Sequence, residues 1–338
     1  MNNYENPMNT CAVIVSYGSR FKFLERVIDS LFAQNISKII IVDNAIAEAD
    51  KKLIKQKKAE HKDIIEIIIK KENTGSAGGY HTGIETAIKN QGCNFIWLLD
   101  DDNLPTMQAL NNLHIFWSAI ENDDKKNSCV LLARRINQPI YEEAIYSGDA
   151  DLFLTRKNNF LGFHIIDSFK VLQKIFFLKA KCSKQKLNSG IIQVAPYGGM
   201  FFHKDLIKKI GLPNKRFFLY ADDFDFSYRI TKMGGKIILV FDAIINDIDE
   251  SWKSVEIKNP IVKLLKGNPR KTFYYVRNRT YFEMKNLMTS RFVYNVNIFI
   301  VICAMCGFSL FNRKNNLFLF FRALHDGKSG KLGKVNFI

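Results

Sequence analysis

Several common signals are missing from this sequence of 338 residues, and each absence narrows the class of protein. The first ten residues carry neither a basic nor an apolar segment, so we expect no secretory signal and a protein that stays where it is made. Six cysteines lack the spacing of a disulfide framework, which favours reduced thiols. Six histidines show no HExxH pattern, and no Gly-Lys-Ser/Thr follows a glycine-rich loop, which excludes a zinc-protease site and a P-loop.

Acidic residues are scarce in the last quarter of the chain. The net charge is +16, and residues 251–338 contribute +13 of it, from 16 basic and three acidic side chains. The same region holds apolar runs over 292–311 and 317–321, each framed by Lys or Arg. This combination is typical of a protein that binds an anionic membrane surface rather than nucleic acid. A membrane-spanning helix and a core for packing in an oligomer are the alternatives for these runs.

The first 135 residues alternate between short apolar runs and segments with helical spacing. With 47% hydrophobic and 13% aromatic residues, the chain has ample material for a core, which excludes disorder. The runs that we expect to form strands are 11–16, 38–43, 64–69, 94–99 and 129–133. Repeated alternation of strands and helices predicts an α/β fold, with a mostly parallel sheet and helices on both faces.

The rest of the chain falls into regions with different sequence patterns. Between about 146 and 196 the alternation stops, and an apolar helix face studded with lysines predicts a helical insertion. The alternation resumes at Gly198. We therefore expect one domain over residues 10–252, including this insertion. A basic helical region over 253–338 would associate with a membrane or pack against another surface.

Three consecutive aspartates, Asp100, Asp101 and Asp102, follow the fourth predicted strand, at the edge where parallel sheets bind ligands. Alternate side chains of an extended chain point the same way, so Asp100 and Asp102 can converge while Asp101 points elsewhere. Two converging carboxylates favour a divalent cation with oxygen ligands. The alternative is a helix N-cap before Pro105, although one acid would satisfy that role.

A second acidic pair, Asp222 and Asp223, lies among aromatic residues where a helical pattern begins. Partial burial would raise the pKa of these carboxyls toward that of a general base. Helix capping is the alternative, and we expect Asp225 either to have that role or to pair with Arg229.

A glycine-rich segment, Gly75-Ser-Ala-Gly-Gly79, opens a predicted helix. Its backbone could approach a phosphate group at the helix N-terminus. Tight packing of the helix on a strand is an equally good explanation for the glycines, and the sequence leaves both open.

In their order along the chain, these motifs resemble the family 2 glycosyltransferases, which have the GT-A fold. The resemblance covers roughly residues 10–252 and is closest to the galactofuranosyltransferase or rhamnosyltransferase-like branch. It rests on Val15-Ser-Tyr-Gly-Ser-Arg20, Ile41-Val-Asp43-Asn44, Asn73-Thr-Gly75-Ser-Ala-Gly-Gly79, Trp97-Leu-Leu-Asp-Asp-Asp102, Tyr197-Gly-Gly-Met-Phe201, Gly211-Leu-Pro213 and Phe217-Phe-Leu-Tyr-Ala-Asp-Asp-Phe-Asp-Phe226.

The resemblance implies a nucleotide-sugar donor, an inverting displacement and a divalent cation, Mg²⁺ or Mn²⁺. Asp100 and Asp102 would hold the cation on the donor diphosphate. Asp223 would be the general base that takes the proton from the acceptor hydroxyl, and Asp43 would contact the nucleobase. The other residues implied in donor binding are Ser16, Tyr17, Arg20, Gly75, Asp100 and Asp101. The residues implied on the acceptor side are Asp222, Tyr197, Gly198 and Gly199.

One departure from the family concerns the metal. The family often has a histidine as a further ligand, after the strand that follows the base helix. Here that strand is 236–240, and the equivalent place reads Ile245-Asn-Asp247-Ile248. Asp247 is the nearest candidate, because its oxygens could bind Mg²⁺ or Mn²⁺. The implied metal site is therefore Asp100, Asp102 and Asp247, with an altered ligand set.

The expected function is metal-dependent transfer of a sugar, with galactofuranose as one candidate, from a UDP-linked donor to a lipid-linked cell-surface polysaccharide. Such an enzyme would lie at the cytoplasmic face of the inner membrane, peripheral or monotopic, with no nucleic-acid partner and with a homo-oligomer as an option. The closest alternative transfers rhamnose or another hexose from a dTDP- or UDP-sugar. A non-enzyme alternative is an inactive partner that tethers another transferase, although Asp100, Asp102 and Asp223 are all present.

Overall fold

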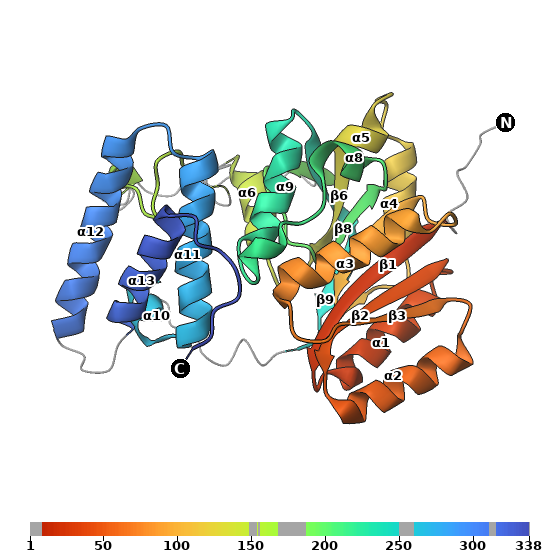
Figure 1. The fold of residues 1–338 in the computed structure, drawn as a ribbon. Coiled ribbons are helices and arrows are strands. Elements are labelled where there is room, and N and C mark those ends of the chain that lie inside the picture. The colour runs from red at the N-terminus through yellow and green to blue at the C-terminus, as the bar shows by residue number, and fades with distance from the viewer. Residues whose placement is uncertain are drawn as a thin grey trace.

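The structure is a computed structural model that describes residues 9–148, 154, 156–167, 187–249, 260–310 and 316–337. Figure 1 shows a sheet domain with a group of C-terminal helices beside it. The strands are β1 (Thr10–Gly18), β2 (Lys38–Ile46), β3 (Ile65–Ile69), β4 (Phe95–Asp100), β5 (Asn103–Pro105), β6 (Cys129–Arg135), β7 (Ser189–Ile192), β8 (Met200–His203) and β9 (Lys236–Asp247). The helices of the sheet domain are α1 (Phe21–Phe32), α2 (Glu48–Glu60), α3 (Gly75–Lys89), α4 (Ala109–Ser118), α5 (Lys125–Ser128), α6 (Ile140–Ser147), α8 (Leu206–Ile210), η2 (Lys215–Phe217) and α9 (Asp222–Lys232). The C-terminal helices are α10 (Pro260–Lys266), α11 (Pro269–Asn286), α12 (Arg291–Leu310) and α13 (Leu317–Lys328).

The strands form one sheet in the order β3-β2-β1-β4-β8-β6-β9-β5, and β7 also pairs with β9. β3, β2, β1 and β4 pair in parallel, and so do β6 and β9. β8 lies antiparallel between β4 and β6. The predicted α/β fold is confirmed. β8 has only four residues, too few for a distinct alternating pattern, which is why the sequence did not reveal this inserted strand.

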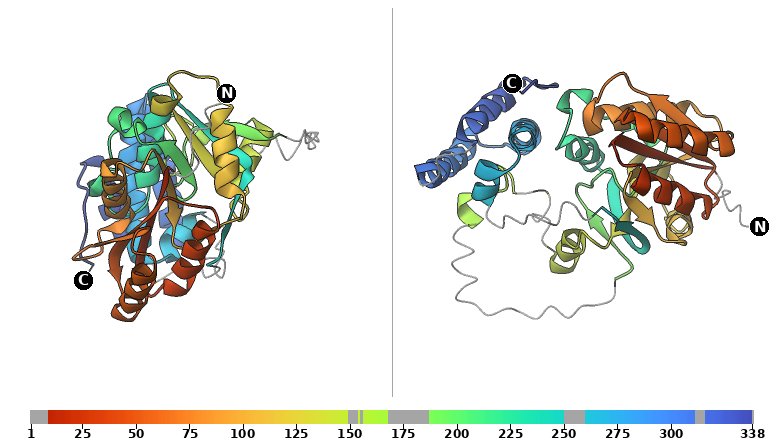
Figure 2. Two further views of the ribbon diagram at one scale, coloured as in Figure 1. Left: turned by 90° about the vertical axis from the view of Figure 1, so that its right-hand side faces the viewer. Right: turned by 90° about the horizontal axis from the view of Figure 1, so that it is seen from below.

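The sheet is covered on both faces, as Figures 1 and 2 show. Along β1, Ala12 and Ile14 point into the core shared with α1 and α4, whereas Cys11 and Val13 point into the core shared with α3 and α9. This two-residue period is the one that an extended strand imposes. Because both faces are buried, β1 reads as a continuous apolar run rather than as an alternating one.

The C-terminal helices have a core of their own. Phe273 and Tyr274 of α11, Ile298 of α12, and Phe320 and Leu324 of α13 are all buried in it. The predicted apolar run over 292–311 is helix α12. Within the described part of the chain, α12 is the one helix long and apolar enough to cross a membrane, over Arg291–Ser309 with mean hydropathy 1.9. Only 28% of that apolar window is buried.

The expected insertion over about 146–196 is described in part. The apolar helix face predicted over 169–180 lies outside the described residues. The described segment 156–167 is attached to α12, because Asn297 Nδ2 donates to the Asn158 carbonyl at 2.8 Å and Asn297 Oδ1 accepts from Ile165 N at 3.0 Å. The domain boundaries drawn from the sequence stay predictions.

Candidate active site

A cavity of about 770 Å³ opens beside the carboxyl ends of β1, β4 and β6. Its size lies within the range of roughly 300–1,000 Å³ that small-molecule sites have. The residues that line it include Tyr17, Arg20, Asp100, Asp102, Arg135 and Tyr220. The cavity therefore lies where parallel sheets bind ligands, and the predicted aspartate triplet contributes to its wall.

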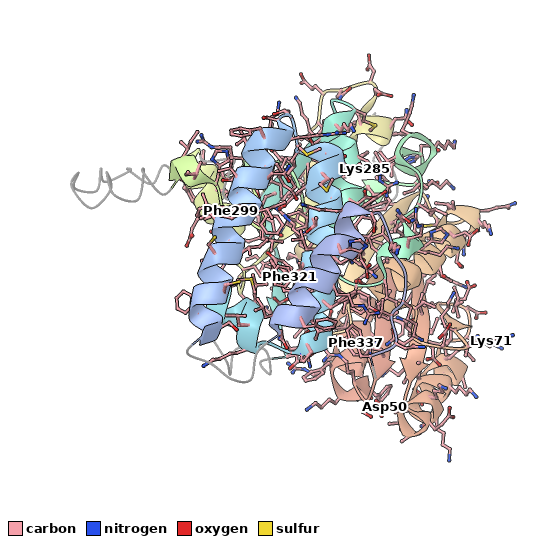
Figure 3. The ribbon with its side chains drawn as sticks, turned by 60° about the vertical axis from the view of Figure 1, so that its left-hand side comes forward. Asp50, Lys71, Lys285, Phe299, Phe321 and Phe337 are labelled. Carbon is pink, nitrogen blue, oxygen red and sulfur yellow. The ribbon has the colours of Figure 1, made fainter. Side chains whose placement is uncertain are left out.

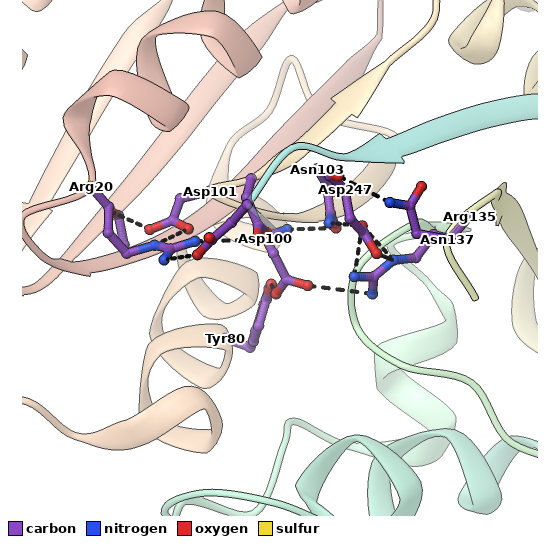
Figure 4. Close-up of polar contacts among 11 residues, drawn as sticks. Arg20, Tyr80, Asp100, Asp101, Asn103, Arg135, Asn137 and Asp247 are labelled. Atoms are coloured by element: carbon purple, nitrogen blue, oxygen red, sulfur yellow. Dashed lines mark hydrogen bonds and ion pairs between the residues drawn. The ribbon is translucent and has the colours of Figure 1, made fainter. Parts of the chain in front are cut away.

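Arg20, just before α1, binds three carboxylates at once (Figure 4). Its Nε donates to Asp101 Oδ1 at 2.7 Å, its Nη1 donates to Asp249 Oδ2 at 2.6 Å, and its Nη2 lies 3.2 Å from Asp102 Oδ2. Ser16 Oγ donates to the second oxygen of Asp101 at 2.6 Å. Burial alone would lower the pKa of the Arg20 guanidinium, but the carboxylates raise it. Both oxygens of Asp101 thus serve to hold the ends of β1 and β4 together.

Arg135, at the end of β6, connects the triplet to β9. Its Nη1 lies 3.5 Å from Asp100 Oδ2, and its Nε and Nη2 contact Asp247 Oδ1 at 2.9 and 2.8 Å. Asn103 Nδ2 donates to the same Asp247 oxygen at 2.9 Å, and the Asp247 side chain is only 2% exposed. A cation could bind that oxygen only by displacing Arg135 or Asn103. In this structure Asp247, predicted as the third metal ligand, supports the residues around Asp100.

Asp100 and Asp102 are the members of the triplet that face solvent. Their side chains are 40% and 15% exposed, against 4% for Asp101. Tyr80 Oη donates to Asp100 Oδ1 at 2.7 Å and so fixes that carboxylate. Burial, together with the charges of Asp100 and Asp101, raises the pKa of Asp102 to about 7. Carboxylates whose charged form is disfavoured gain from a nearby cation.

The donor set at the triplet fits Mg²⁺ or Mn²⁺. Mg²⁺ is held by one or two carboxylates and completes its shell with water and substrate phosphates. Asp100 and Asp102 supply two such carboxylates beside the cavity. Among the described residues, no three His, Cys, Asp or Glu side chains converge as a complete metal site. Two carboxylates beside a cavity suit a cation whose other ligands are water and phosphate oxygens.

Asp222 and Asp223 begin α9 and lie in different surroundings. Ser76 Oγ donates to Asp222 Oδ2 at 2.7 Å, and Asp222 is buried. Burial, with the adjacent charge of Asp223, raises the pKa of Asp222 to about 8. Burial also raises the pKa of Asp223 to about 6, and the charge of Asp100 adds to that rise. The two carboxyls thus have different partners, since Asp222 accepts from Ser76 and Asp223 Oδ1 accepts from Phe224 N at 2.8 Å.

Comparison with known proteins identifies the domain. Residues 11–166 match the model of glycosyl transferase family 2. This segment is similar to a family 2 glycosyltransferase domain, and the match covers less than half of the chain. The match includes the triplet, with Arg20 and Arg135, and no curated protein matches the sequence.

Two solved structures share the fold of this chain. The crystal structure of GalNAc-T7 with UDP, GalNAc and Mn²⁺ is 13% identical, with a TM-score of 0.51, over 72% of this chain and 44% of that one. The mannosyltransferase PcManGT from Pyrobaculum calidifontis, in complex with GDP-Man and Mn²⁺, is 13% identical, with a TM-score of 0.50, over 97% of this chain and 76% of that one. At this identity the likeness concerns the GT-A fold alone. The chain spans less than half of the GalNAc-T7 chain.

The predicted acceptor-side turn, Tyr197–Gly199, packs against the triplet. The Tyr197 ring lies on the Tyr80 ring, with centroids 4.2 Å apart. A Cβ at Gly198 would lie 2.2 Å from Asn103 Oδ1 and 2.6 Å from Asp100 Oδ2. A side chain at 198 would therefore displace Asp100. Contact of this turn with an acceptor stays a prediction.

The remaining residues predicted to bind the donor have mixed surroundings. Tyr17 lines the cavity and is half exposed. Asp43 is buried, and its Oδ1 accepts from Ile46 N at 2.7 Å. Gly75 has φ +72°, and a Cβ there would lie 1.8 Å from the Phe218 carbonyl oxygen. Close packing therefore accounts for this glycine, and the donor contacts of these residues stay predictions.

Sequence reasoning missed several polar residues of the site. Arg135 follows the fifth predicted strand and Asp249 lies two residues beyond Asp247, so both carried the signal of a polar side chain at a strand end. Asn103 and Tyr80 carried no such signal. Their roles depend on contacts with Asp247 and Asp100 that only the folded chain shows.

Proposed function

We propose that this glycosyltransferase is a metal-dependent, inverting enzyme that moves a sugar from a UDP-linked donor to a hydroxyl of a lipid-linked cell-surface glycan. Galactofuranose is the sugar to test first. The observation that carries the proposal is the cavity at the carboxyl ends of β1 and β4, which Asp100 and Asp102 line together with Tyr220, two residues before α9. The crystal structures of GalNAc-T7 and PcManGT, which contain UDP or GDP-Man with Mn²⁺, support a nucleotide donor and a cation.

The chemistry follows from the placement of these side chains. A cation held by Asp100 and Asp102 would neutralise the diphosphate leaving group. Arg20 and Arg135 keep these two carboxylates in place, at 3.2 Å from Asp102 and 3.5 Å from Asp100. Because rigid placement removes the cost of reorganising the site during the reaction, these ion pairs favour turnover.

Asp223 has the properties of a general base in this scheme. It takes the proton from the acceptor hydroxyl as the acceptor oxygen forms a bond to the anomeric carbon. The bond from that carbon to the phosphate oxygen breaks on the opposite side, so the configuration inverts and the nucleoside diphosphate leaves. A pKa of about 6 keeps Asp223 mostly ionised at pH 7, yet more basic than an ordinary aspartate.

Release of nucleoside diphosphate tests the proposal directly. Purified protein with Mn²⁺ is given a panel of UDP- and dTDP-sugars, with and without a lipid-linked glycan acceptor. We expect acceptor-stimulated release of UDP, led by UDP-galactofuranose. Release of dTDP from dTDP-rhamnose would favour the rhamnosyltransferase alternative. No release from any donor would favour the inactive tethering partner.

The metal requirement is tested within the same assay. Asp102→Asn removes one charged oxygen ligand and should nearly abolish turnover, while the circular dichroism spectrum stays that of the folded protein. Asp205→Asn controls for the loss of an aspartate charge, because Asp205 pairs with Lys208 on α8 and is not among the residues that line the cavity. Full activity in EDTA would contradict a metal-dependent reaction.

We propose further that the enzyme attaches to the cytoplasmic face of the inner membrane through α12 and α13. Phe292 and Phe299 of α12 are 79% and 66% exposed, and Phe318 of α13 is 80% exposed. Phe299 and Phe321 lie on these two helices in Figure 3. Since residues 251–338 carry a net charge of +13, exposed aromatics in this region suit an anionic lipid surface.

A peripheral attachment agrees with the packing of α12. Its other face, which includes Tyr294 and Ile298, is buried against the C-terminal core. A helix with one face in a protein core and one aromatic face outside suits the plane of an interface. A spanning helix and a surface for a second copy of the chain are the alternative outcomes of the vesicle experiment below.

A further inference from the structure

The chain reaches the base helix through a segment of unusual backbone, residues 217–221. Phe218, Tyr220 and Ala221 have φ of +66°, +67° and +59°, although none is glycine. Phe218 is the centre of a tight turn with ψ −63°, closed by a hydrogen bond of 2.8 Å from Leu219 N to the Phe217 carbonyl. A γ-turn with positive φ is rare and strained. Such a conformation persists only where its surroundings hold it.

Helix α11 supplies much of that hold. Asn278 Nδ2 lies 2.8, 2.7 and 3.0 Å from the carbonyl oxygens of Phe217, Leu219 and Tyr220. Arg277 Nη2 donates to the Phe217 carbonyl at 3.2 Å, and Arg277 Nε donates to Asn278 Oδ1 at 2.9 Å. Both side chains are fully buried. The amide nitrogen of one side chain thus lies within hydrogen-bond distance of three carbonyl groups of the strained segment.

The start of α3 holds the segment from another direction. The Phe218 carbonyl fills the space where Gly75 has no side chain, and it accepts from Ala77 N at 3.3 Å. Ser76 Oγ donates to Asp222, the first residue of α9. Residues 217–222 are therefore held between α3 of the sheet domain and α11 of the C-terminal helices.

We propose that Asn278 is a positioning residue for the base, which fixes the 217–221 backbone and thereby the direction in which α9 presents Asp223. This inference rests on the proposed function for the role of Asp223. Asn278 does not touch the cavity. It acts through the carbonyl of Tyr220, which lines the cavity, and through Ala221, which precedes α9. The C-terminal helices are on this basis part of the catalytic machinery as well as a surface for attachment.

Asn278→Asp tests the proposal, with Asn297→Asp as its matched control. Aspartate has the size of asparagine and keeps an oxygen for Arg277, but it loses the amide donor. Asn297 is equally buried and also binds backbone groups through its amide, but those groups belong to the segment at 158–165. The control thus removes a comparable buried donor from the same group of helices without touching 217–221.

Two measurements are made on each variant. In hydrogen–deuterium exchange, Asn278→Asp should speed exchange over residues 218–222 at least tenfold, whereas Asn297→Asp should leave this stretch unchanged. In UDP release from the best UDP-sugar of the panel, Asn278→Asp should lower kcat roughly 100-fold. The KM for the donor should stay within about twofold, because the triplet is on other elements. A purely structural role would instead give the same kcat loss in both variants.

The outcomes separate this inference from the proposed function. Unchanged exchange over 218–222 in Asn278→Asp, or equal kcat in the two variants, would overturn the positioning role. Absence of UDP release in the wild-type protein would contradict the proposed function, and the exchange comparison would still decide whether Asn278 holds the segment. Should Asn278→Asp fail to fold, Asn278→Ser retains one donor and is compared in the same way.

Discussion

Helices α11 and α12 follow each other in the chain, yet they differ in which side chains they bury: the apolar α12 exposes aromatic side chains, and the polar α11 buries polar ones. α12 is apolar, but Phe292 and Phe299 are largely exposed. α11 is polar, but much of it is buried. Its buried polar side chains are Thr272, Arg277, Asn278, Arg279, Thr280 and Glu283. Both helices bury apolar side chains in the C-terminal core, but α12 also exposes aromatic side chains and α11 also buries polar ones, which departs from the usual pattern of a surface helix.

The difference shows that the composition of each helix matches the surface against which it lies. Buried polar groups are costly unless they are hydrogen-bonded. In α11, Arg277 and Asn278 bind the 217–221 backbone, and Arg279 pairs with Glu283. Exposed aromatic groups gathered on one surface are typical of a binding site. The polar composition of α11 therefore suits a neighbouring backbone that needs donors, and the apolar composition of α12 suits a surface outside the protein.

The largest expected effect comes from a change at Asp223, the proposed base that α11 is proposed to position. Asp223→Asn should lower kcat by about 10²–10⁴-fold, because that is the contribution of general-base catalysis. UDP affinity with Mn²⁺, measured by titration calorimetry, should change little. Asp222→Asn is the control and should chiefly raise the acceptor KM. Loss of kcat in Asp222→Asn alone would show that Asp222 is the base and Asp223 binds the acceptor. Normal kcat in both variants would show that the pair only caps the helix.

A buried ion pair within α11 gives the largest expected effect on stability. Glu283 is fully buried, accepts from Arg279 Nε at 2.8 Å, and also accepts from Leu161 N at 3.2 Å. Glu283→Gln removes the negative charge that faces the buried Arg279, so the free energy of unfolding in urea should fall by about 3–5 kcal/mol. The exposed pair Lys89–Glu85 has the same spacing along a helix, so Glu85→Gln is the matched control. Its cost should stay below about 0.5 kcal/mol, and equal costs would show that the α11 pair is not a buried ion pair.

The exposed face of α12 is tested with vesicles. Phe299→Asp should weaken binding to phosphatidylglycerol vesicles by roughly tenfold or more, since burying a phenylalanine contributes about 1.5–3 kcal/mol. Ile115 of α4, also exposed but in the sheet domain, provides the control Ile115→Asp. Deletion of residues 292–338 is unsuitable here, because Phe320 and its neighbours belong to the C-terminal core. Unchanged vesicle binding with a change in oligomeric state would instead favour a second copy as the partner.

The smallest effect concerns pH. Burial raises the pKa of Asp102 to about 7 and of Asp222 to about 8, whereas unfolded aspartates titrate near pH 3.9. The folded protein therefore binds more protons than the unfolded chain between about pH 4 and 8, and the free energy of unfolding falls as pH rises through this range. We expect a fall of at least about 1 kcal/mol between pH 5 and 8. Asp222→Asn should make the dependence shallower, and an unchanged slope would contradict the raised pKa of this group.

Local sequence patterns were sufficient to predict a sheet flanked by helices and to locate the acidic clusters. The strands around β1 and β4 are apolar runs, and Asp100–Asp102 follow one of them, so fold class and triplet could be read from neighbouring residues. The short strand β8 could not, because its place between β4 and β6 is set by long-range pairing. Gly75 shows the same limit. Its sequence context allowed a phosphate contact or close packing, and only the folded chain shows that the Phe218 carbonyl occupies the space beside Gly75.

The residues around the acidic clusters show where prediction from sequence ends. Asp247 could be named from its position after a strand, but its engagement by Arg135 and Asn103 could not. Asn278 had no recognisable signal, because a single asparagine in a polar helix is ordinary on an exposed surface. Its contacts with carbonyl groups about 60 residues earlier in the chain exist only after the helices have packed.

The hold of Asn278 on the 217–221 segment has a consequence for synthesis. The ribosome completes the triplet, the strained segment and Asp223 before it makes α11. Until Arg277 and Asn278 have left the exit tunnel, the carbonyls of Phe217, Leu219 and Tyr220 lack the donors that hold them. A nascent chain that already contains the predicted donor-binding residues would therefore carry a proposed base whose backbone is not yet held in place. Competence for sugar transfer would arrive late in translation, together with the helices proposed to bring the enzyme to its membrane.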